Sequence, residues 1–438
     1  AHGDETAEAT SAAGAVVTYT SPATSDAVDG AGVAICVPAS GSTFALGTTP
    51  VTCNATDAAG NAATPTNFNV TVADTTPPSI TIGIVSGPQV TSGGNTYVTS
   101  ATTFRVTATD GGSGIASCGI TVTDAASTVV ATPPCVAGNN DFQLILADGA
   151  YAIAATATDV AGNAAATGNL HVRLDTTPPD ISIGSGETDD ITWDQAHLRH
   201  GILSNDATLT LAGNATDSVC IREVRTVDVD SGLTTASQQP PSALGYSLSA
   251  PLHTGINTID VTAEDCAGWT KAIRIQVVYV VPGPFDPRGK GFWYNAVKAG
   301  SYTTGQMQTF VDYTNVASDL WGNDASRNRY GALTLANYRT ILGVPDSANM
   351  EQKMKAQLLA DWLNMVSGRL AVKKPVNVSA ITGWPTVMDD IGGNPLTFAY
   401  KVALEIEEKV QPAPASAAIN TVAKNLAEGI NLRTIILP

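Results

Sequence analysis

Asp74-Thr-Thr-Pro-Pro78 recurs about one hundred residues later as Asp175-Thr-Thr-Pro-Pro179. A second segment recurs with it: Ala55-Thr-Asp-Ala-Ala-Gly-Asn61 returns as Ala157-Thr-Asp-Val-Ala-Gly-Asn163 and, in a weaker copy, as Ala263-Glu-Asp-Cys-Ala-Gly-Trp269. This period matches the length of one β-sandwich and is too long for one turn of a solenoid. The sequence therefore predicts three β-sandwich modules in tandem.

The segments around these repeats have the pattern of half-buried strands. Apolar and polar residues alternate in Phe68–Val72, Phe104–Ala108, Tyr151–Ala155 and Ile273–Val277. Between such runs, Gly60 and Gly162 can adopt positive φ, and Asp57 and Asp159 can accept hydrogen bonds from backbone amides. We expect hairpin turns there. The paired prolines predict extended links between the modules.

After Pro282-Gly-Pro-Phe-Asp-Pro287 the apolar period changes from two to that of a helix. Thr304 is the expected cap of a helix that contains Met307, Phe310 and Val311 and extends to Leu320, and Asp346 and Ser347 precede a second helix over 350–366 that stops at Gly368. Two more helices are expected at about 396–410 and 417–428.

The expected fold class is therefore multidomain, with three all-β immunoglobulin-like sandwiches followed by a mainly α domain. Module one covers 1–74 and lacks its first strand, module two covers 75–175, module three covers 176–282, and the helical domain covers 283–438 and ends in a short β-type tail.

Charge is distributed unevenly along the 438 residues, whose net charge is −17. Residues 1–285 contain 7 Lys or Arg against 26 Asp or Glu, while residues 286–438 contain 15 against 13. The first basic residue is Arg105, so nucleic acid is not an expected partner. No apolar run is long enough to span a membrane and no signal peptide precedes Ala1, so we expect a mature exported protein, extracellular, at the cell surface or secreted.

The six cysteines form one local pair in each repeat. The pairs are Cys36 with Cys53, Cys118 with Cys135, and Cys220 with Cys266, and none has the Cys-x-x-Cys spacing of a metal or redox site. Three disulfides within modules, formed in an oxidising compartment, are the expected arrangement.

Module one resembles the hyalin-repeat and related bacterial immunoglobulin-like modules. The resemblance lies in Gly41-Ser-Thr-Phe-Ala-Leu-Gly-Thr-Thr-Pro-Val-Thr-Cys53, the Thr-Pro-Pro link and the Ala-Thr-Asp-x-Ala-Gly-Asn turn. Modules two and three match more loosely, and module three departs at Trp269 and in an insert around 187–200. Gly291-Phe-Trp293 and Met354–Asn364 resemble a small helical domain found at the C-termini of bacterial surface proteins. The resemblance implies an adhesive or spacer role and supplies no catalytic residues.

Acidic residues in turns and at module junctions are the candidate ligands for a metal ion. Calcium prefers several hard oxygen ligands. The candidates are Asp228 and Asp230, at alternate positions of one turn, and the junction residues Asp74, Asp110, Asp159 and Asp175. We therefore expect either no cofactor or calcium that stiffens the modules.

Catalytic candidates are weak, so we expect that the protein is not an enzyme. Asp194, His197 and His200 would align only on a helix, and the adjacent acids Asp189/Asp190 and Asp389/Asp390 belong to no catalytic motif. N-glycosylation sequons occur at Asn54, Asn69, Asn214 and Asn377.

The two chain ends suggest how copies of the protein could join. Modules two and three open with Pro78-Ser-Ile-Thr-Ile82 and Pro179-Asp-Ile-Ser-Ile183, for which module one has no counterpart. The last residues form a short apolar run: Arg433, Thr434, Ile435, Ile436, Leu437 and Pro438. We expect that this tail of one chain supplies the missing strand of module one in the next chain, or instead packs on its own domain.

The functional hypothesis is a structural subunit of a cell-surface filament or layer that polymerises with itself head to tail. Two alternatives are an adhesin stalk whose C-terminal domain binds a surface glycan or protein, and a secreted hydrolase with an unrecognised site in 286–438.

Overall fold

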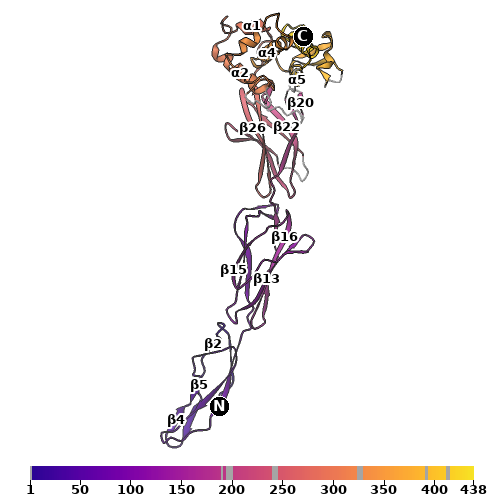
Figure 1. Cartoon of the computed structure of the whole chain (residues 1–438). Coiled ribbons are helices and arrows are strands. Elements are labelled where there is room, and N and C mark those ends of the chain that lie inside the picture. The colour runs from indigo at the N-terminus through magenta and orange to yellow at the C-terminus, as the bar shows by residue number, and fades with distance from the viewer. Residues whose placement is uncertain are drawn as a thin grey trace. The chain divides into compact units, whose positions relative to one another are not determined.

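Alternating side chains place one face of each strand in a module core. The computed structural model describes residues 2–188, 191–193, 201–238, 245–322, 329–389, 393–410 and 415–438. It divides into two compact units, Ala1–Thr177, with modules one and two, and Pro178–Pro438, with module three and the helical domain (Figure 1).

Module one contains eight strands among its described residues. They are β1 (Glu5–Glu8), β2 (Ala15–Val17), β3 (Ala23–Asp26), β4 (Gly30–Val33), β5 (Ile35–Val37), β6 (Ser42–Phe44), β7 (Gly47–Asn54) and β8 (Thr66–Ala73). One sheet has the order β1-β8-β7-β5, and β2 pairs with β6. Phe44, Val51, Phe68 and Val70 form the core beside the Cys36–Cys53 disulfide.

Module two places its opening strand at the edge of a three-stranded sheet. Its strands are β9 (Ser79–Ser86), β10 (Gln89–Ser92), β11 (Asn95–Val98), β12 (Thr103–Thr109), β13 (Ile115–Asp124), β14 (Val129–Ala131), β15 (Gly138–Gln143), β16 (Gly149–Asp159), β17 (Ala164–Ala166) and β18 (Leu170–Leu174). The sheets have the orders β15-β12-β9 and β10-β11-β18-β16-β13-β14, with β17 on β16.

Module three also has two sheets, but a further strand pairs with the outer edge of its opening strand. Its strands are β19 (Asp180–Thr188), β20 (Ile191–Trp193), β21 (Gly201–Ser204), β22 (Thr208–Thr216), β23 (Ile221–Asp228), β24 (Leu233–Gln238), β25 (Gly245–Pro251), β26 (Gly255–Asp265) and β27 (Thr270–Tyr279). The sheets have the orders β20-β19-β22-β25 and β21-β27-β26-β23-β24. The remaining disulfides join Cys118 to Cys135 and Cys220 to Cys266, the pairs expected from the sequence.

The helical domain contains α1 (Lys290–Asn295), α2 (Thr304–Ala317), α3 (Tyr338–Leu342), α4 (Met350–Val366), α5 (Ala399–Val410) and α6 (Ala417–Asn431), the short 3-10 helices η2 (Val378–Ala380) and η3 (Trp384–Thr386), and the two-stranded sheet of β28 (Pro375–Asn377) and β29 (Leu396–Phe398).

The predicted cap of α2, Thr304, is wrong by one residue. Thr303 caps α2, because its side chain and that of Gln306 each bond the other's backbone amide. Asn349 caps α4 in the same way with Gln352, in place of Asp346 or Ser347. Leu320 lies beyond α2 but is fully buried.

Module three and the helical domain share one hydrophobic core. Leu203, Val278 and Val280 of the module lie in the same buried cluster as Trp293 and Trp362 of the helices. The backbone amide of Leu203 donates to the Tyr400 hydroxyl (3.1 Å), and that of Val372 donates to Asn205 Oδ1 (2.7 Å). Figure 1 shows the helices grouped at one end of β22 and β26. The second unit is therefore continuous from module three to the helices.

No helix within the described ranges is both long and apolar enough to cross a membrane.

Candidate functional site

Four candidate sites emerge from the fold: an aspartate cluster at the start of module two, a strand edge and an acidic pocket in module one, and a cluster of arginines at the base of the C-terminal tail.

The aspartate cluster joins Asp74, Asp110 and Asp159. One carboxylate oxygen from each lies within 4.8 Å of the others, and Asp74 and Asp159 are buried. Asp74 precedes the two prolines, Asp110 follows β12, and Asp159 ends β16. The fold thus brings together three of the four junction residues that the sequence analysis selected.

Backbone amides orient these carboxylates. Asp74 Oδ2 accepts from the Ser113 amide (2.6 Å), and Asp110 Oδ2 accepts from Gly112 (3.0 Å) and Gly114 (2.6 Å). Hydrogen bonds from Ser113 hold the pKa of Asp74 below its ordinary value, so this group stays charged. A Cβ on Gly112 would lie 2.4 Å from the Asp74 carboxylate, which leaves room only for glycine. Three oriented, oxygen-only ligands fit a hard cation such as calcium.

The turn residues Asp228 and Asp230 belong to no such group of three ligands within the described ranges. Asp228 Oδ1 accepts from the amides of Asp230 and Ser231, which is the bonding of a turn, and no third metal-ligand side chain joins them among the described residues. Asp175 is buried, and its amide donates to the Val98 carbonyl (2.9 Å). The candidates Asp189, Asp190, Asp194, His197, His200 and Asp390 lie outside the described residues. Asp389 forms an ion pair with Lys409 (2.8 Å).

The sequons differ in exposure. Asn54, Asn69 and Asn214 are exposed on strands. Asn377 is half-buried, and its side chain accepts from the Ser379 amide.

The unpaired edge belongs to β2. In modules two and three, β12 and β22 each lie between two neighbours, one of which is the opening strand β9 or β19. Their counterpart β2 pairs only with β6 among the described residues. Its burial alternates: Ala15 and Val17 face the core, while Val16 is 63% exposed. Module one therefore presents a strand edge at the position that β9 and β19 occupy in the other modules.

The tail of residues 433–438 packs on its own domain in the single chain. Ile435 is only 3% exposed, its carbonyl accepts from the Asn377 amide (2.8 Å), and the Leu437 amide donates to the Pro375 carbonyl (2.9 Å). Ile436 makes an isolated antiparallel bridge with Val376. The second of the two arrangements expected for the tail is thus the one seen in the isolated chain.

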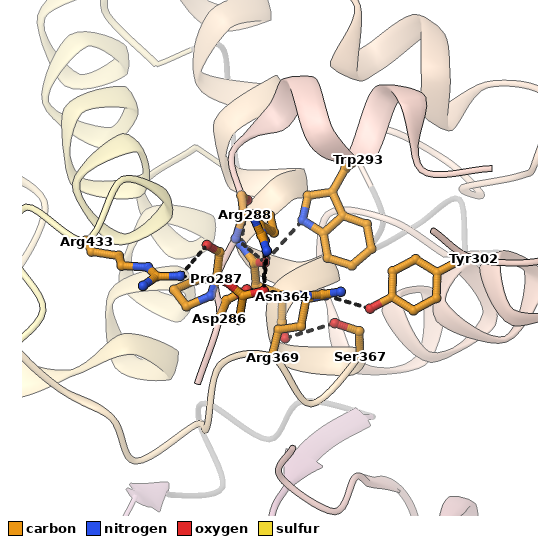
Figure 2. Close-up of polar contacts among 9 residues, drawn as sticks. All are labelled: Asp286, Pro287, Arg288, Trp293, Tyr302, Asn364, Ser367, Arg369 and Arg433. Atoms are coloured by element: carbon orange, nitrogen blue, oxygen red, sulfur yellow. Dashed lines mark hydrogen bonds and ion pairs between the residues drawn. The ribbon is translucent and has the colours of Figure 1, made fainter. Parts of the chain in front are cut away.

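Three guanidinium groups converge on one carboxylate at the base of this tail (Figure 2). Asp286 Oδ2 lies 2.5 Å from Arg288 and 2.6 Å from Arg369, and its Oδ1 lies 2.7 Å from Arg433. We call these four residues the arginine cluster. Partial burial raises the pKa of Asp286, but Arg288 and Arg369 outweigh this effect, so the pKa lies below its ordinary value.

Aromatic rings and an amide support the arginine cluster. Arg288 and Arg369 lie over the Phe292 ring, at 5.3 and 5.0 Å, and Arg433 lies over Phe285 at 5.2 Å. Asn364 accepts from the Arg288 backbone and the Trp293 indole (Figure 2). From the sequence, Pro282–Pro287 is predicted only as a domain boundary, and the arginine cluster is not predicted. The available signal was the charged pair Asp286 and Arg288 at alternate positions of a proline-rich link.

An acidic pocket lies in module one. It has a volume of about 340 Å³ and is lined by residues that include Asp26, Asp29 and Asp57. Asp29 Oδ2 accepts from the Ala58 amide (2.8 Å), and Asp26 Oδ1 accepts from the Val28 and Asp29 amides. Bonds from Asp29 and Val28 lower the pKa of Asp26, so the pocket carries negative charge.

Comparison with known proteins supports the module type. Residues 5–72 match the HYR domain family. Among solved structures, the chain is similar to fibronectin(III)-like modules of Clostridium thermocellum CbhA (14% identity, 45% of this chain and 94% of that chain, TM-score 0.25). It is also similar to a Ca²⁺-stabilized adhesin of an Antarctic bacterium (20% identity, 54% of this chain and 57% of that chain, TM-score 0.20). A search of curated proteins finds no significant match. Module one is thus HYR-like. The strand order of the sheets makes the chain a tandem array of immunoglobulin-like modules with a helical domain.

Proposed function

We propose that this protein is an extracellular structural subunit of a cell-surface filament, and that the C-terminal tail of one chain pairs with β2 of the next. The observation that carries the proposal is the edge of β2, which has no strand where β12 has β9 and β22 has β19 among the described residues. Three disulfides support a location outside the cytoplasm. The proposed role is mechanical and involves no catalytic step.

The tail has the side-chain spacing of an opening strand. In β19, Ile181 and Ile183 are 4% and 0% exposed and fill the core of module three. Ile435 and Leu437 have the same spacing of two, so a tail in extended conformation would direct both into module one. Ile436 would then face outward, as Val16 of β2 does.

Donation exchanges one set of contacts for a similar set. The tail must leave the buried site of Ile435 and give up its backbone bonds to Pro375 and Asn377 and those of Thr434 and Ile435 to Gly429. In return it gains a ladder beside β2, of the kind that β9 forms along the whole of β12. Because the donor and acceptor surfaces differ, the contact is heterologous and extends into a filament unless its rotation closes a ring.

We further propose that calcium at Asp74, Asp110 and Asp159 stiffens the link between modules one and two. The three carboxylates support this proposal, because one oxygen of each lies within 4.8 Å of the others and the negative charges repel one another without a cation. Bound calcium would supply positive charge to all three, and the chain's own residues would orient the ligands.

Deletion of residues 434–438 tests filament formation. The truncated chain should remain monomeric under conditions in which the full chain forms filaments, as measured by light scattering and electron microscopy. Because Ile435 is buried, a second variant, Leu437→Ser, changes a half-buried residue and should also abolish filaments while leaving the thermal midpoint of the second unit nearly unchanged. Leu432→Ser, at a residue 59% exposed just before the tail, is the matched control. Filaments of normal yield from the truncated chain would overturn the proposal.

A further inference from the structure

We propose that the acidic pocket of module one receives the arginine cluster of the preceding chain, so that charge pairing guides the tail to β2. This inference rests on the proposed function. The partner is therefore a second copy of this chain.

Module two shows at which end a strand beside β2 would enter. In module two the opening strand starts at Ser79, which pairs with Thr109, and Asp110 and the Asp159 turn lie at that end. Module one has the same turn: the Asn61 amide donates to Asp57 Oδ1 (2.7 Å), as the Asn163 amide donates to Asp159 Oδ1 (2.8 Å). A strand beside β2 with the direction of β9 therefore enters at the end that holds Asp57 and the acidic pocket.

The arginine cluster lies directly before the strand that would enter. Arg433 follows the C-cap of α6 and has a φ of 62°, so the chain turns there and separates the helix from the tail. Its ion pair with Asp286 does not involve residues 434–438, so those residues can leave their site while Arg433 stays in place. When the tail lies beside β2, Arg433 lies next to the end of module one at which the tail enters.

The charges of the two surfaces are complementary. Module one contains no Lys or Arg, and its acidic residues are Asp4, Glu5, Glu8, Asp26, Asp29, Asp57 and Asp74. The arginine cluster has three guanidinium groups for one carboxylate, and the side chains of Arg288 and Arg433 are 46% and 45% exposed. Each guanidinium has five donors, more than Asp286 alone can satisfy. Such complementarity accelerates association and fixes its direction.

A double-mutant cycle on the full-length chain tests this pairing. Filament elongation is measured at about 0.05 M salt, where surface charges are weakly screened, for wild type, Arg288→Gln, Asp26→Asn with Asp29→Asn, and the combination. Each change alone should slow elongation on the order of tenfold, and the combination should slow it no further. Raising the salt to about 0.5 M should slow wild type and leave the combined variant unaffected.

Matched controls separate pairing from folding. Asp124→Asn changes an acidic residue with the same turn bonding in module two, and Arg274→Gln changes an exposed arginine of module three; both should elongate like wild type. Unchanged or strictly additive rates in the cycle would overturn the inference. Calcium binding to the monomer that is lost in Asp26→Asn with Asp29→Asn would overturn it too, because the pocket would then be a cation site. If elongation also proceeds without residues 434–438, the proposed function fails; if the tail is required but the cycle shows no coupling, only this inference fails.

Discussion

Arg433 forms a 2.7 Å ion pair with Asp286, which joins the base of the C-terminal tail to the segment between module three and α1. The two residues are separated by 147 positions in the sequence. Arg288 and Arg369 share the same carboxylate, so one aspartate fixes three positive charges at the surface where the tail begins. Loss of the negative charge of Asp286 should therefore affect both the stability of the second unit and the position of the tail.

Neutralising Asp286 should change the acid stability of the second unit. The pKa of Asp286 lies below its ordinary value in the folded chain, so its contribution to stability is present above the unfolded pKa and is lost as the pH falls through the folded pKa. Asp286→Asn should lower the free energy of unfolding by about 1 kcal/mol at neutral pH and make the acid limb shallower. Thermal unfolding between about pH 2 and 7 measures this, with Asp346→Asn, an exposed carboxyl, as the control. If the stability of Asp286→Asn fell as steeply at low pH as that of wild type, protonation of Asp286 would not be a cause of the acid unfolding.

The contribution of Asp361 to stability should depend on pH in the opposite direction. It lies fully buried in α4, neither carboxylate oxygen has a partner among the described residues, and burial raises its pKa well above the ordinary value. Its contribution to stability is therefore complete below the unfolded pKa and is lost as the pH rises through the folded pKa. Asp361→Asn should raise the free energy of unfolding at neutral pH by on the order of 1 kcal/mol or more and leave stability at low pH nearly unchanged. A lower midpoint at neutral pH would show that the charged carboxylate has a stabilising partner.

The repeats allowed much of the modular fold to be predicted from sequence. Strand alternation, hairpin turns and cysteine pairs are local patterns, so Phe68, Phe104 and Ile153 could be placed on core faces without knowledge of the rest of the chain. The grouping of Asp74, Asp110 and Asp159 followed from the same logic, because each ends a strand or link at one junction.

Contacts between distant segments could not be predicted in this way. Leu203 meets Tyr400 across 197 positions, and Arg369 meets Asp286 across 83. Neither pair has a local pattern: the first depends on how the helices pack against module three, and the second on how the chain after α4 meets the link that precedes α1. The capping error at Thr304 has a local cause: Thr303 and Thr304 are adjacent hydroxyl residues, and only the position of Gln306 selects Thr303.

Calcium should stabilise the first unit through the aspartate cluster. If the cation binds only the folded state, calcium at one hundred times its dissociation constant adds about 2.7 kcal/mol to the free energy of unfolding. The thermal midpoint of the first unit should rise with calcium and fall with EDTA, and Asp110→Asn should remove the difference. Asp141→Asn, a surface carboxyl of module two paired with Arg105, should retain it. A calcium shift of equal size in Asp110→Asn would place the bound ion elsewhere.

Gly201 should be essential to the joint between module three and the helices. A Cβ at this position would lie 1.6 Å from the Val316 carbonyl oxygen, so any side chain must push β21 away from the C-terminal end of α2. Gly201→Ala should destabilise the second unit by about 1–3 kcal/mol, with Gly245→Ala, where no atom lies within 4 Å, as the control. Calorimetry should show module three and the helical domain melting less cooperatively. A single unshifted transition would show that the joint tolerates the added methyl group.

Cysteines placed on β2 and on the tail should cross-link neighbouring chains. Val16 points away from the core of module one, and Ile436 lies between Ile435 and Leu437, so both face outward when the tail seats beside β2. A chain with Val16→Cys and Ile436→Cys should form a covalent ladder under mild oxidation in assembled filaments, visible on a non-reducing gel, and only monomer when assembly is blocked by dilution. The control replaces Val16→Cys with Thr43→Cys, because Thr43 is the partner of Val16 on β6, on the opposite side of β2. With the tail beside β2, the strand β2 lies between the tail and Thr43. The Cα atoms of Thr43 and of the tail are then two strand spacings apart, about 10 Å, which is more than a disulfide allows. Equal ladders from both pairs would mean random collision, and no ladder from Val16 with Ile436 in intact filaments would rule out the seating of the tail beside β2.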